Sequence, residues 1–189
     1  MQTEAKYQHL ERSAAREAFE KLIAIQPHVY HGTTRDRLRS IRSRGLDPSY
    51  EHSQSSYHYA WEEPPAIRLA IDPAIAIQTA NSRSQKYDDV VGFMVVARPV
   101  LLRFKTELLL TKEIGIDHSF APMQAEFKDL QGQNTTPLNA TTFLGLIKKH
   151  RIFSTYTIIE LTAIECSTAM HPNGAFVAVL EFNDIVPKF

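Results

Sequence analysis

The sequence is poor in the features that define several large protein classes. It holds a single cysteine, Cys166, in 189 residues, which excludes an internal disulfide framework and a thiolate-rich metal site. No apolar run approaches the roughly 20 residues that a membrane helix needs, and residues 1–26 carry charges throughout, without the apolar core of a secretion signal. These absences fit a reducing compartment. We expect a cytoplasmic protein, or one delivered into a host cytoplasm by a route that the sequence does not show.

An excess of charge of one sign is also missing. The 21 Lys and Arg residues balance 21 Asp and Glu residues, so the formal net charge at pH 7 is zero. No overall field therefore marks the chain as a nucleic-acid or membrane binder, although local charge can still matter. The sequence also contains no HExxH or Cys–His cluster, no Walker-type glycine loop and no GxSxG elbow, and we expect no metal.

What the sequence does contain is the pattern of one α+β domain. A chain of 189 residues with a hydrophobic share of 43% suits a single domain with a substantial core. Residues 1–27 are expected to be an N-terminal unit, with an amphipathic helix over residues 3–25 packed on the rest. Residues 28–189 are expected to form the main domain, a mainly antiparallel sheet with flanking helices, one after each of the first two strands.

Apolar alternation and turn residues predict the elements of this domain. Strands are expected over residues 28–31, 66–72, 90–104, 155–166 and 174–182. Thr34 as N-cap and Gly45 as C-cap would bound the helix after the first strand. Pro73 would begin the helix after the second strand, and Asn139 would cap a later one. Residues 105–139 show no clear pattern.

The stretch "VYHGTTRDRLRSIRSRGLDP", residues 29–48, contains more than a turn requires. Gly32 alone would suffice for the turn, but Tyr30 and His31 precede it and two threonines follow it. A His-Gly-Thr corner presents mixed donors and acceptors beside an open backbone, so we interpret it as a ligand site. The alternative is a histidine with satisfied hydrogen bonds at a strand end, next to an ordinary turn glycine.

Several stretches resemble the ADP-ribosyltransferase superfamily. "VYHGTT" with "IRSRGLDP" looks like its first signature, found in the poly(ADP-ribose) polymerase-like branch, the diphtheria-type toxins and the RNA 2′-phosphotransferases. "AIRLAIDPAIAIQTA" resembles the second signature, and "YTIIELTAIE" the last catalytic strand of the polymerase branch. The tail "NGAFVAVLEFNDIVPKF" is similar to the end of the 2′-phosphotransferases. The resemblance covers residues 28–189 and implies that family's α+β fold with a split antiparallel sheet.

The resemblance implies that the corner binds NAD as a substrate. The His31 imidazole would hydrogen-bond the ribose on the nicotinamide side, and the Gly32 backbone would hold the carboxamide. Thr33 would offer its hydroxyl to the adenosine ribose. Tyr30 and Thr34, which flank these three residues, complete the expected set on this strand.

The second signature departs from the family pattern at Arg68. The polymerase branch places a nicotinamide-stacking tyrosine in or near this strand, whereas an arginine is similar to the phosphate-binding positions of the 2′-phosphotransferases. We include Arg68 in the NAD site. Tyr57, Tyr59 and Trp61 lie just upstream, and we name Tyr59 as the candidate aromatic wall. The alternative is that these aromatic residues only cover the sheet edge.

An NAD transferase of this kind also uses a glutamate to stabilise the oxocarbenium-like transition state electrostatically. The family position in "YTIIEL" falls near Thr155, which is not acidic. Glu126 in "QAEF" resembles the Gln-x-Glu motif that toxin-type transferases carry on a loop before a strand. Glu160 lies further along the expected last strand. The third alternative is chemistry without a glutamate, as in the 2′-phosphotransferases.

Arginines gather directly behind the corner, with Asp36 as the only acid among them. They are Arg35, Arg37, Arg39, Arg42 and Arg44. One interpretation is contact with phosphates, either those of NAD or those of a nucleic-acid target. The other is a solvated helix surface paired with nearby acids such as Glu62 and Glu63.

We therefore expect an NAD-dependent mono-ADP-ribosyltransferase, a toxin- or effector-like enzyme of the glycosyltransferase class. It would transfer a single ADP-ribose to a protein or nucleic acid and release nicotinamide. One alternative is an RNA 2′-phosphotransferase-like enzyme with NAD as acceptor. The other is a catalytically silent binding module with the same fold.

Overall fold

The strands form one antiparallel sheet. The computed structural model describes residues 12–49, 66–91, 99–117, 120–133, 139–160, 165–167 and 183–184. Within these ranges seven strands pair in the order β4-β5-β2-β1-β3-β6-β7, and every pairing is antiparallel. The α+β class expected from the sequence is confirmed, with a helix after each of the first two strands.

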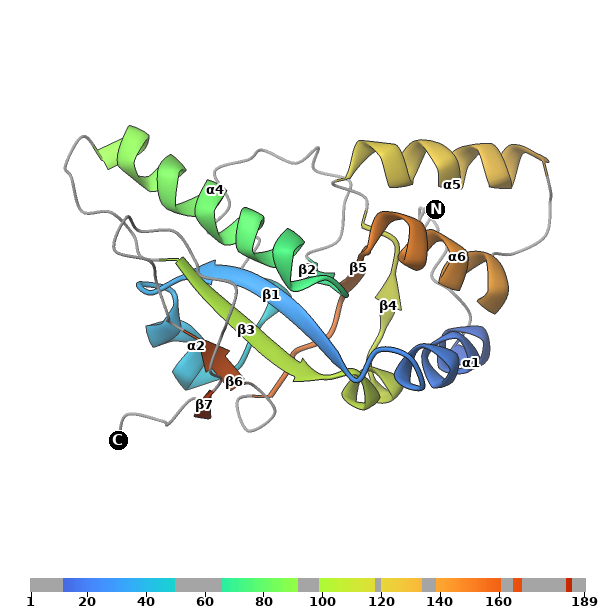
Figure 1. Cartoon of the computed structure of the whole chain (residues 1–189), viewed down its shortest axis with the longest axis horizontal. Helices are drawn as coiled ribbons and strands as arrows, with labels where there is room; N and C mark the ends of the chain where they lie inside the picture. The colour runs from blue at the N-terminus through green and yellow to red at the C-terminus, as the bar shows by residue number, and fades with distance from the viewer. Residues whose placement is uncertain are drawn as a thin grey trace, which may run out of the picture.

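The described strands have at most seven residues, whereas the longest described helix, α4, has 19 (Figure 1). The described strands are β1 (His28–Thr34), β2 (Ile67–Ala70), β3 (Pro99–Lys105), β4 (Ile114–Gly115), β5 (Ile152–Thr155), β6 (Glu165–Ser167) and β7 (Asn183–Asp184). The described helices are α1 (Arg12–Ile23), α2 (Leu38–Arg44), α4 (Pro73–Val91), α5 (Ala121–Gln133), α6 (Ala140–His150) and the 3-10 helix η1 (Thr106–Thr111).

β1 is the central strand, but it pairs over very different lengths with its two neighbours, β3 and β2. It pairs with β3 along its whole length, from His28 opposite Lys105 to Thr34 opposite Pro99. With β2 it shares a single register pair, Tyr30 opposite Ala70. The sequence analysis expected a split sheet, but β1 and β2 belong to one sheet and are joined in register at this pair.

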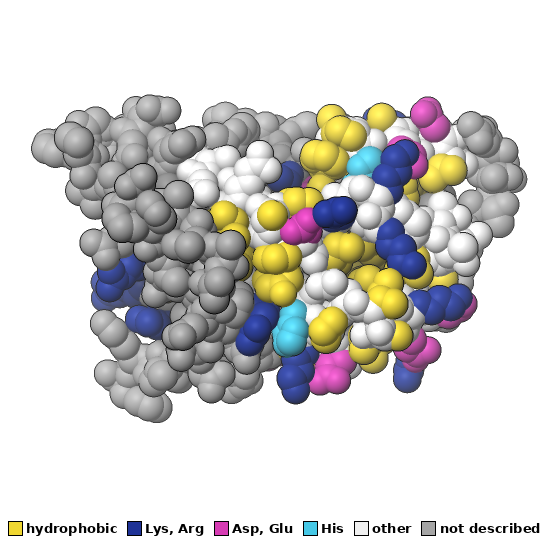
Figure 2. All heavy atoms as spheres, viewed as in Figure 1, with side chains coloured by type: hydrophobic (Ala, Val, Ile, Leu, Met, Phe, Trp, Pro, Cys, Tyr) yellow, Lys and Arg dark blue, Asp and Glu magenta, His cyan; other side chains and the backbone are white. Residues whose placement is uncertain are grey.

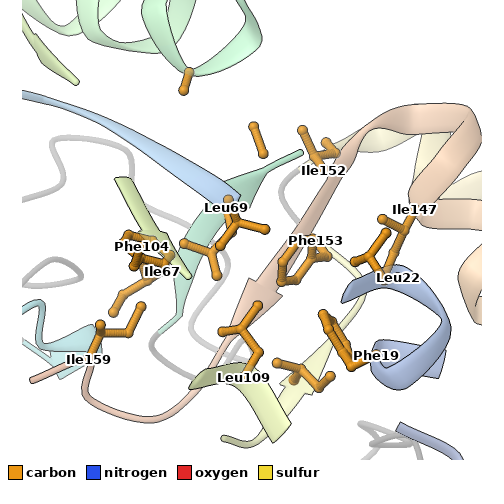
Figure 3. Packing of buried hydrophobic residues seen from close by; sticks show 14 of the residues in the cluster. Phe19, Leu22, Ile67, Leu69, Phe104, Leu109, Ile147, Ile152, Phe153 and Ile159 are labelled. Carbon is orange, nitrogen blue, oxygen red and sulfur yellow. The ribbon is translucent and has the colours of Figure 1, made fainter. Parts of the chain in front are cut away.

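Aromatic side chains join the sheet to the helices on one side. Phe153 of β5 contacts Phe19 of α1 with ring centroids 5.4 Å apart, and Phe143 of α6 lies 6.3 Å from Phe19. Figure 3 shows Phe153 between Leu69 of β2 and Leu22 of α1, and all of these side chains are buried. The N-terminal helix thus packs into the same core as the sheet. α4 lies along β1 and β3 instead (Figure 1).

Local structure explains one boundary in each of three helices. Asp72 accepts from the Ala74 N–H at 2.9 Å and caps α4, whose first residue is Pro73. Asn139 accepts from the Thr142 N–H at 2.9 Å and caps α6, as the sequence predicted. Gly45 ends α2 with φ of 76°, a conformation that favours glycine. These three helix boundaries are confirmed.

The corner after β1 differs from the expectation. β1 continues to Thr34 because Gly32, Thr33 and Thr34 pair with β3. Gly32 is therefore inside a strand and not in a turn, and Thr34 ends the strand without capping a helix. α2 begins only at Leu38, after a turn. Ladder hydrogen bonds to β3 outweigh the turn preference of glycine here.

The single strand expected over residues 155–166 is wrong. β5 ends at Thr155, Ile159 forms an isolated bridge with Leu46, and a new strand, β6, begins at Glu165. β5 pairs with β2 and β6 pairs with β3, so the chain crosses from one side of β1 to the other. The strand expected over 174–182 lies outside the described residues, as do residues 3–11 of the first helix and 92–98 of the third strand.

Gly32 offers a direct test of this packing. A Cβ at Gly32 would lie 1.9 Å from the Ala76 carbonyl oxygen of α4, whereas a Cβ at Gly145 on α6 would meet nothing within 4 Å. We expect Gly32→Ala to lower the free energy of unfolding by about 1–3 kcal/mol through overpacking. The matched control, Gly145→Ala, should raise it by about 0.5–1 kcal/mol, because alanine is the better helix former. Urea denaturation measures both values, and equal stability of the two variants would contradict the register of β1 under α4.

Candidate functional site

His31 lies where the register pairing of β1 and β2 stops. Beyond the pair of Tyr30 and Ala70, the Arg68 carbonyl of β2 accepts a hydrogen bond from Nδ1 of His31 at 2.8 Å. The His31 side chain is buried. The His31 side chain thus donates to the Arg68 carbonyl in place of a backbone N–H of a neighbouring strand. The structure brings His31 and Arg68 together as the sequence analysis expected.

The contacts of His31 fix its tautomer. A carbonyl oxygen only accepts, so Nδ1 carries the proton. Nη1 of Arg83 on α4 lies 3.3 Å from Nε2 and donates to the Gly32 carbonyl oxygen at 2.9 Å. A guanidinium only donates, so Nε2 is the acceptor and the imidazole is neutral. Sequence reasoning missed Arg83, since nothing in the pattern of its helix singles it out.

Gly32 has a packing role that the sequence did not show. The side on which a Cβ would project is filled by α4, at the Ala76 carbonyl oxygen and the Ala80 nitrogen. The glycine and these two alanines let strand and helix approach closely. The sequence analysis expected an open backbone at Gly32. On this side that expectation is wrong, because α4 closes it. Any ligand contact at Gly32 has to come from another direction.

The side-chain hydroxyls of Thr33 and Thr34 are buried without hydrogen-bond partners in the described structure. Leaving a buried hydroxyl unpaired costs about 1–3 kcal/mol. Consecutive residues of a strand point to opposite faces, so the two hydroxyls flank the end of β1. They are donors and acceptors that the fold itself does not use.

Arg68 links a carboxylate to this cluster. Its Nε forms an ion pair with Oδ2 of Asp117, a buried residue that follows β4. The Arg68 side chain is 31% exposed, so part of it reaches solvent. Sequence reasoning missed Asp117, because only the fold brings it next to Arg68. The candidate aromatic residues Tyr57, Tyr59 and Trp61 lie outside the described residues.

Tyr30 faces away from His31. The register places Tyr30 opposite Arg103 and His31 opposite Leu102, on alternate faces of the sheet. Burial raises the pKa of the Tyr30 phenol, and Asp72 adds to that rise while Arg103 opposes it. The phenol is therefore neutral at physiological pH. The residues expected to hold NAD on β1 are thus divided between the two faces of the strand.

Glu126 lies on α5 and contacts α6, away from the His31 cluster. It lies within α5, not on a loop before a strand as its motif had suggested. Its Oε2 lies 2.7 Å from Nζ of Lys149 and 2.8 Å from Nε2 of His150, both at the end of α6. Figure 1 shows α5 on the outer side of α6, at a distance from the end of β1. The carboxylate therefore bridges two helices.

Glu160 lies beyond the end of β5, next to the C-cap of α2. Nζ of Lys112 contacts both of its carboxylate oxygens, at 2.6 and 2.7 Å. The Lys112 hydrogen bond lowers the pKa of this carboxyl. The side chain is mostly exposed, and Ile159 beside it pairs with Leu46. Glu160 is thus ionised and exposed, but it is not part of the His31 cluster.

Comparison with known proteins gives no further guide to the site. No family model, curated protein or solved structure matches the chain. The described residues contain no group of three or more His, Cys, Asp or Glu side chains placed to hold a metal ion. None of the helices in the described ranges is both long enough and apolar enough to cross a bilayer.

The setting of Glu126 predicts a pH-dependent contribution to stability. Hydrogen bonds from Lys149 and then His150 lower the pKa of its carboxyl. The contribution is therefore complete above the ordinary glutamate pKa of about 4.3 and is lost as the pH falls through the lowered value. We expect Glu126→Gln to lower the free energy of unfolding at pH 7 by less than about 1 kcal/mol. In urea denaturation from pH 7 to pH 3, this difference from the wild type should shrink in the acid range.

The control is Glu107→Gln, which removes an exposed glutamate 3.8 Å from Lys105. We expect that variant to match the wild type throughout. A constant difference between Glu126→Gln and the wild type down to pH 3 would contradict the bridging role of Glu126.

Proposed function

We propose that the end of β1 binds NAD and that the protein transfers ADP-ribose from it to a macromolecular target, releasing nicotinamide. The observation that carries the proposal is the buried, unpaired hydroxyl of Thr33, on the same face of β1 as the neutral His31, with the unpaired hydroxyl of Thr34 on the other face of the strand end. A dinucleotide offers ribose hydroxyls that can both donate and accept. It would therefore satisfy groups that the described fold leaves without partners.

The arginines around His31 suit the charged part of the same ligand. In the free protein Arg83 engages both Nε2 of His31 and the Gly32 carbonyl, and the contact with Nε2 is the longer of the two at 3.3 Å. A ribose hydroxyl that donates to Nε2 would replace the longer of these two Arg83 contacts. The guanidinium of Arg83 and the exposed part of Arg68 would contact the pyrophosphate, which forked donors bind well.

A carboxylate near the cluster supplies the remaining chemical requirement. NAD brings a bond between nicotinamide and ribose whose cleavage builds positive charge on the sugar, and a fixed carboxylate stabilises that charge. Asp117 is the carboxylate bound to the side chain of Arg68, the residue whose backbone carbonyl accepts from His31. Glu126 and Glu160 are each paired with cations elsewhere. We therefore propose Asp117 first in this role, ahead of Glu160 and Glu126.

One observation favours a second candidate function. A histidine flanked by Arg68 and Arg83 is similar to the set of arginines and a histidine with which the 2′-phosphotransferases work without a glutamate. In that case the substrate would be a 2′-phosphorylated RNA, with NAD as the acceptor of its phosphate. Nicotinamide release would then depend on that RNA.

Nicotinamide release from NAD by the purified protein tests the proposal. Cell lysate would supply acceptors in one series, and a 2′-phosphorylated RNA in another. We expect the wild type to release nicotinamide with lysate and His31→Ala to lose this activity, since the neutral imidazole is gone. Asp117→Asn should reduce the rate by about a hundredfold or more, as for other groups that stabilise transition-state charge. Glu126→Gln should retain it.

His150→Gln is the matched control, because it removes another partly buried histidine, on α6. Circular dichroism would show that each variant is folded. Release that needs the 2′-phosphorylated RNA would select the second candidate. No release in either series, together with no NAD binding by calorimetry, would refute both and leave a fold with a different use.

A further inference from the structure

A row of arginines leads away from the candidate site. Arg35 follows Thr34 directly. Arg39 comes four residues after Arg35, and Arg42 comes three residues after Arg39. The Leu38 N–H bonds to the Arg35 carbonyl and the Ile41 N–H to the Arg37 carbonyl, so the turn continues into α2 with helix-like hydrogen bonds. Arg39 and Arg42 lie on one side of α2, three residues apart, and Arg35 precedes them in the turn that leads into the helix. We call Arg35, Arg39 and Arg42 the arginine stripe.

The stripe carries charge that the described protein does not neutralise. Arg35 and Arg39 are exposed and Arg42 is half-buried. Throughout the described ranges no hydrogen bond or ion pair engages the side chains of these three residues, and Nε of Arg42 is buried without a partner. On the side of the molecule away from α2, Lys and Arg lie beside Asp and Glu, as the right half of Figure 2 shows. The acids that the sequence analysis offered as partners, Glu62 and Glu63, lie outside the described residues.

The stripe is held rigidly relative to β1. Leu38 and Ile41 of α2 are buried in the core. The left-handed Gly45 ends the helix, and a Cβ there would lie 2.3 Å from the Ile159 carbonyl oxygen. Leu46 then pairs with Ile159 through two backbone hydrogen bonds, of 2.8 and 3.0 Å. The guanidiniums therefore start from a fixed scaffold, which lowers the entropic cost of binding a ligand.

We propose that the arginine stripe binds the phosphate backbone of a nucleic acid, which makes nucleic acid the acceptor class for the transferase. This inference rests on the function proposed above. The seven steps along the chain from Arg35 to Arg42 span about 10 Å at helical rise, and one nucleic-acid strand carries a charge about every 3.4 Å along its axis. A line of three guanidiniums thus matches about three successive phosphates. Forked arginine donors, with no lysine in the segment, suit phosphate oxygens.

Fluorescence anisotropy with a labelled single-stranded oligonucleotide of about 20 nucleotides tests the stripe without NAD. We expect a logarithmic plot of affinity against salt with a slope of about −2, from about three phosphate contacts on a single strand. Replacing all three residues (Arg35→Gln, Arg39→Gln, Arg42→Gln) should weaken binding about tenfold or more and flatten the slope by about 2. The double variant Arg35→Gln, Arg39→Gln changes only exposed residues, so it reports on binding if Arg42→Gln disturbs the fold.

The matched control removes three exposed lysines from other elements (Lys105→Gln, Lys128→Gln, Lys148→Gln) and changes the net charge equally. We expect it to bind as the wild type does. Equal losses in both triple variants, unchanged binding in the stripe variants, or no binding by the wild type would overturn the proposal. Equally tight binding of polyglutamate would also overturn it, in favour of an acidic protein partner. Because these assays contain no NAD, their failure is distinct from a failure to release nicotinamide.

Discussion

The hydrogen bond between Nδ1 of His31 and the Arg68 carbonyl is the interaction on which the candidate site depends. It joins β1 to β2 just where their register pairing stops at Tyr30 and Ala70. By placing the proton on Nδ1, it leaves Nε2 as the acceptor that Arg83 faces. It also sets Arg68, with Asp117 on its Nε, beside the same strand. The imidazole thus contacts Arg83 directly and Arg68 through its backbone carbonyl, and the Arg68 side chain binds Asp117.

The same corner serves folding and, in our proposal, binding. Gly32 is required because α4 lies directly against it, so the glycine needs no ligand to explain it. His31 likewise has hydrogen-bond partners within the protein. The hydroxyls of Thr33 and Thr34 differ, because the described fold gives them no partner and their burial is costly. They are the residues that distinguish a binding site from a well-packed strand end.

The sequence predicted what local patterns control and missed what distant contacts decide. The α+β class, the caps at Gly45 and Asn139 and the start of α4 follow from short-range preferences, and all are confirmed. The length of β1 was underestimated because pairing with β3 outweighs the turn preference of Gly32. His31 and Arg68 were expected together. Arg83 and Asp117 could not be predicted, since only the packing of α4 and β4 brings them to that cluster.

The protonation of His31 is the most direct test of this account. Long-range proton–nitrogen NMR spectra would report the tautomer of each of the 8 histidines, with His31→Asn used to assign the resonance. We predict a neutral imidazole protonated at Nδ1, and a shift of its Nε2 resonance on addition of NAD that His150 does not show. An imidazole protonated at Nε2, or an Nε2 resonance that NAD leaves unchanged, would contradict the proposed site.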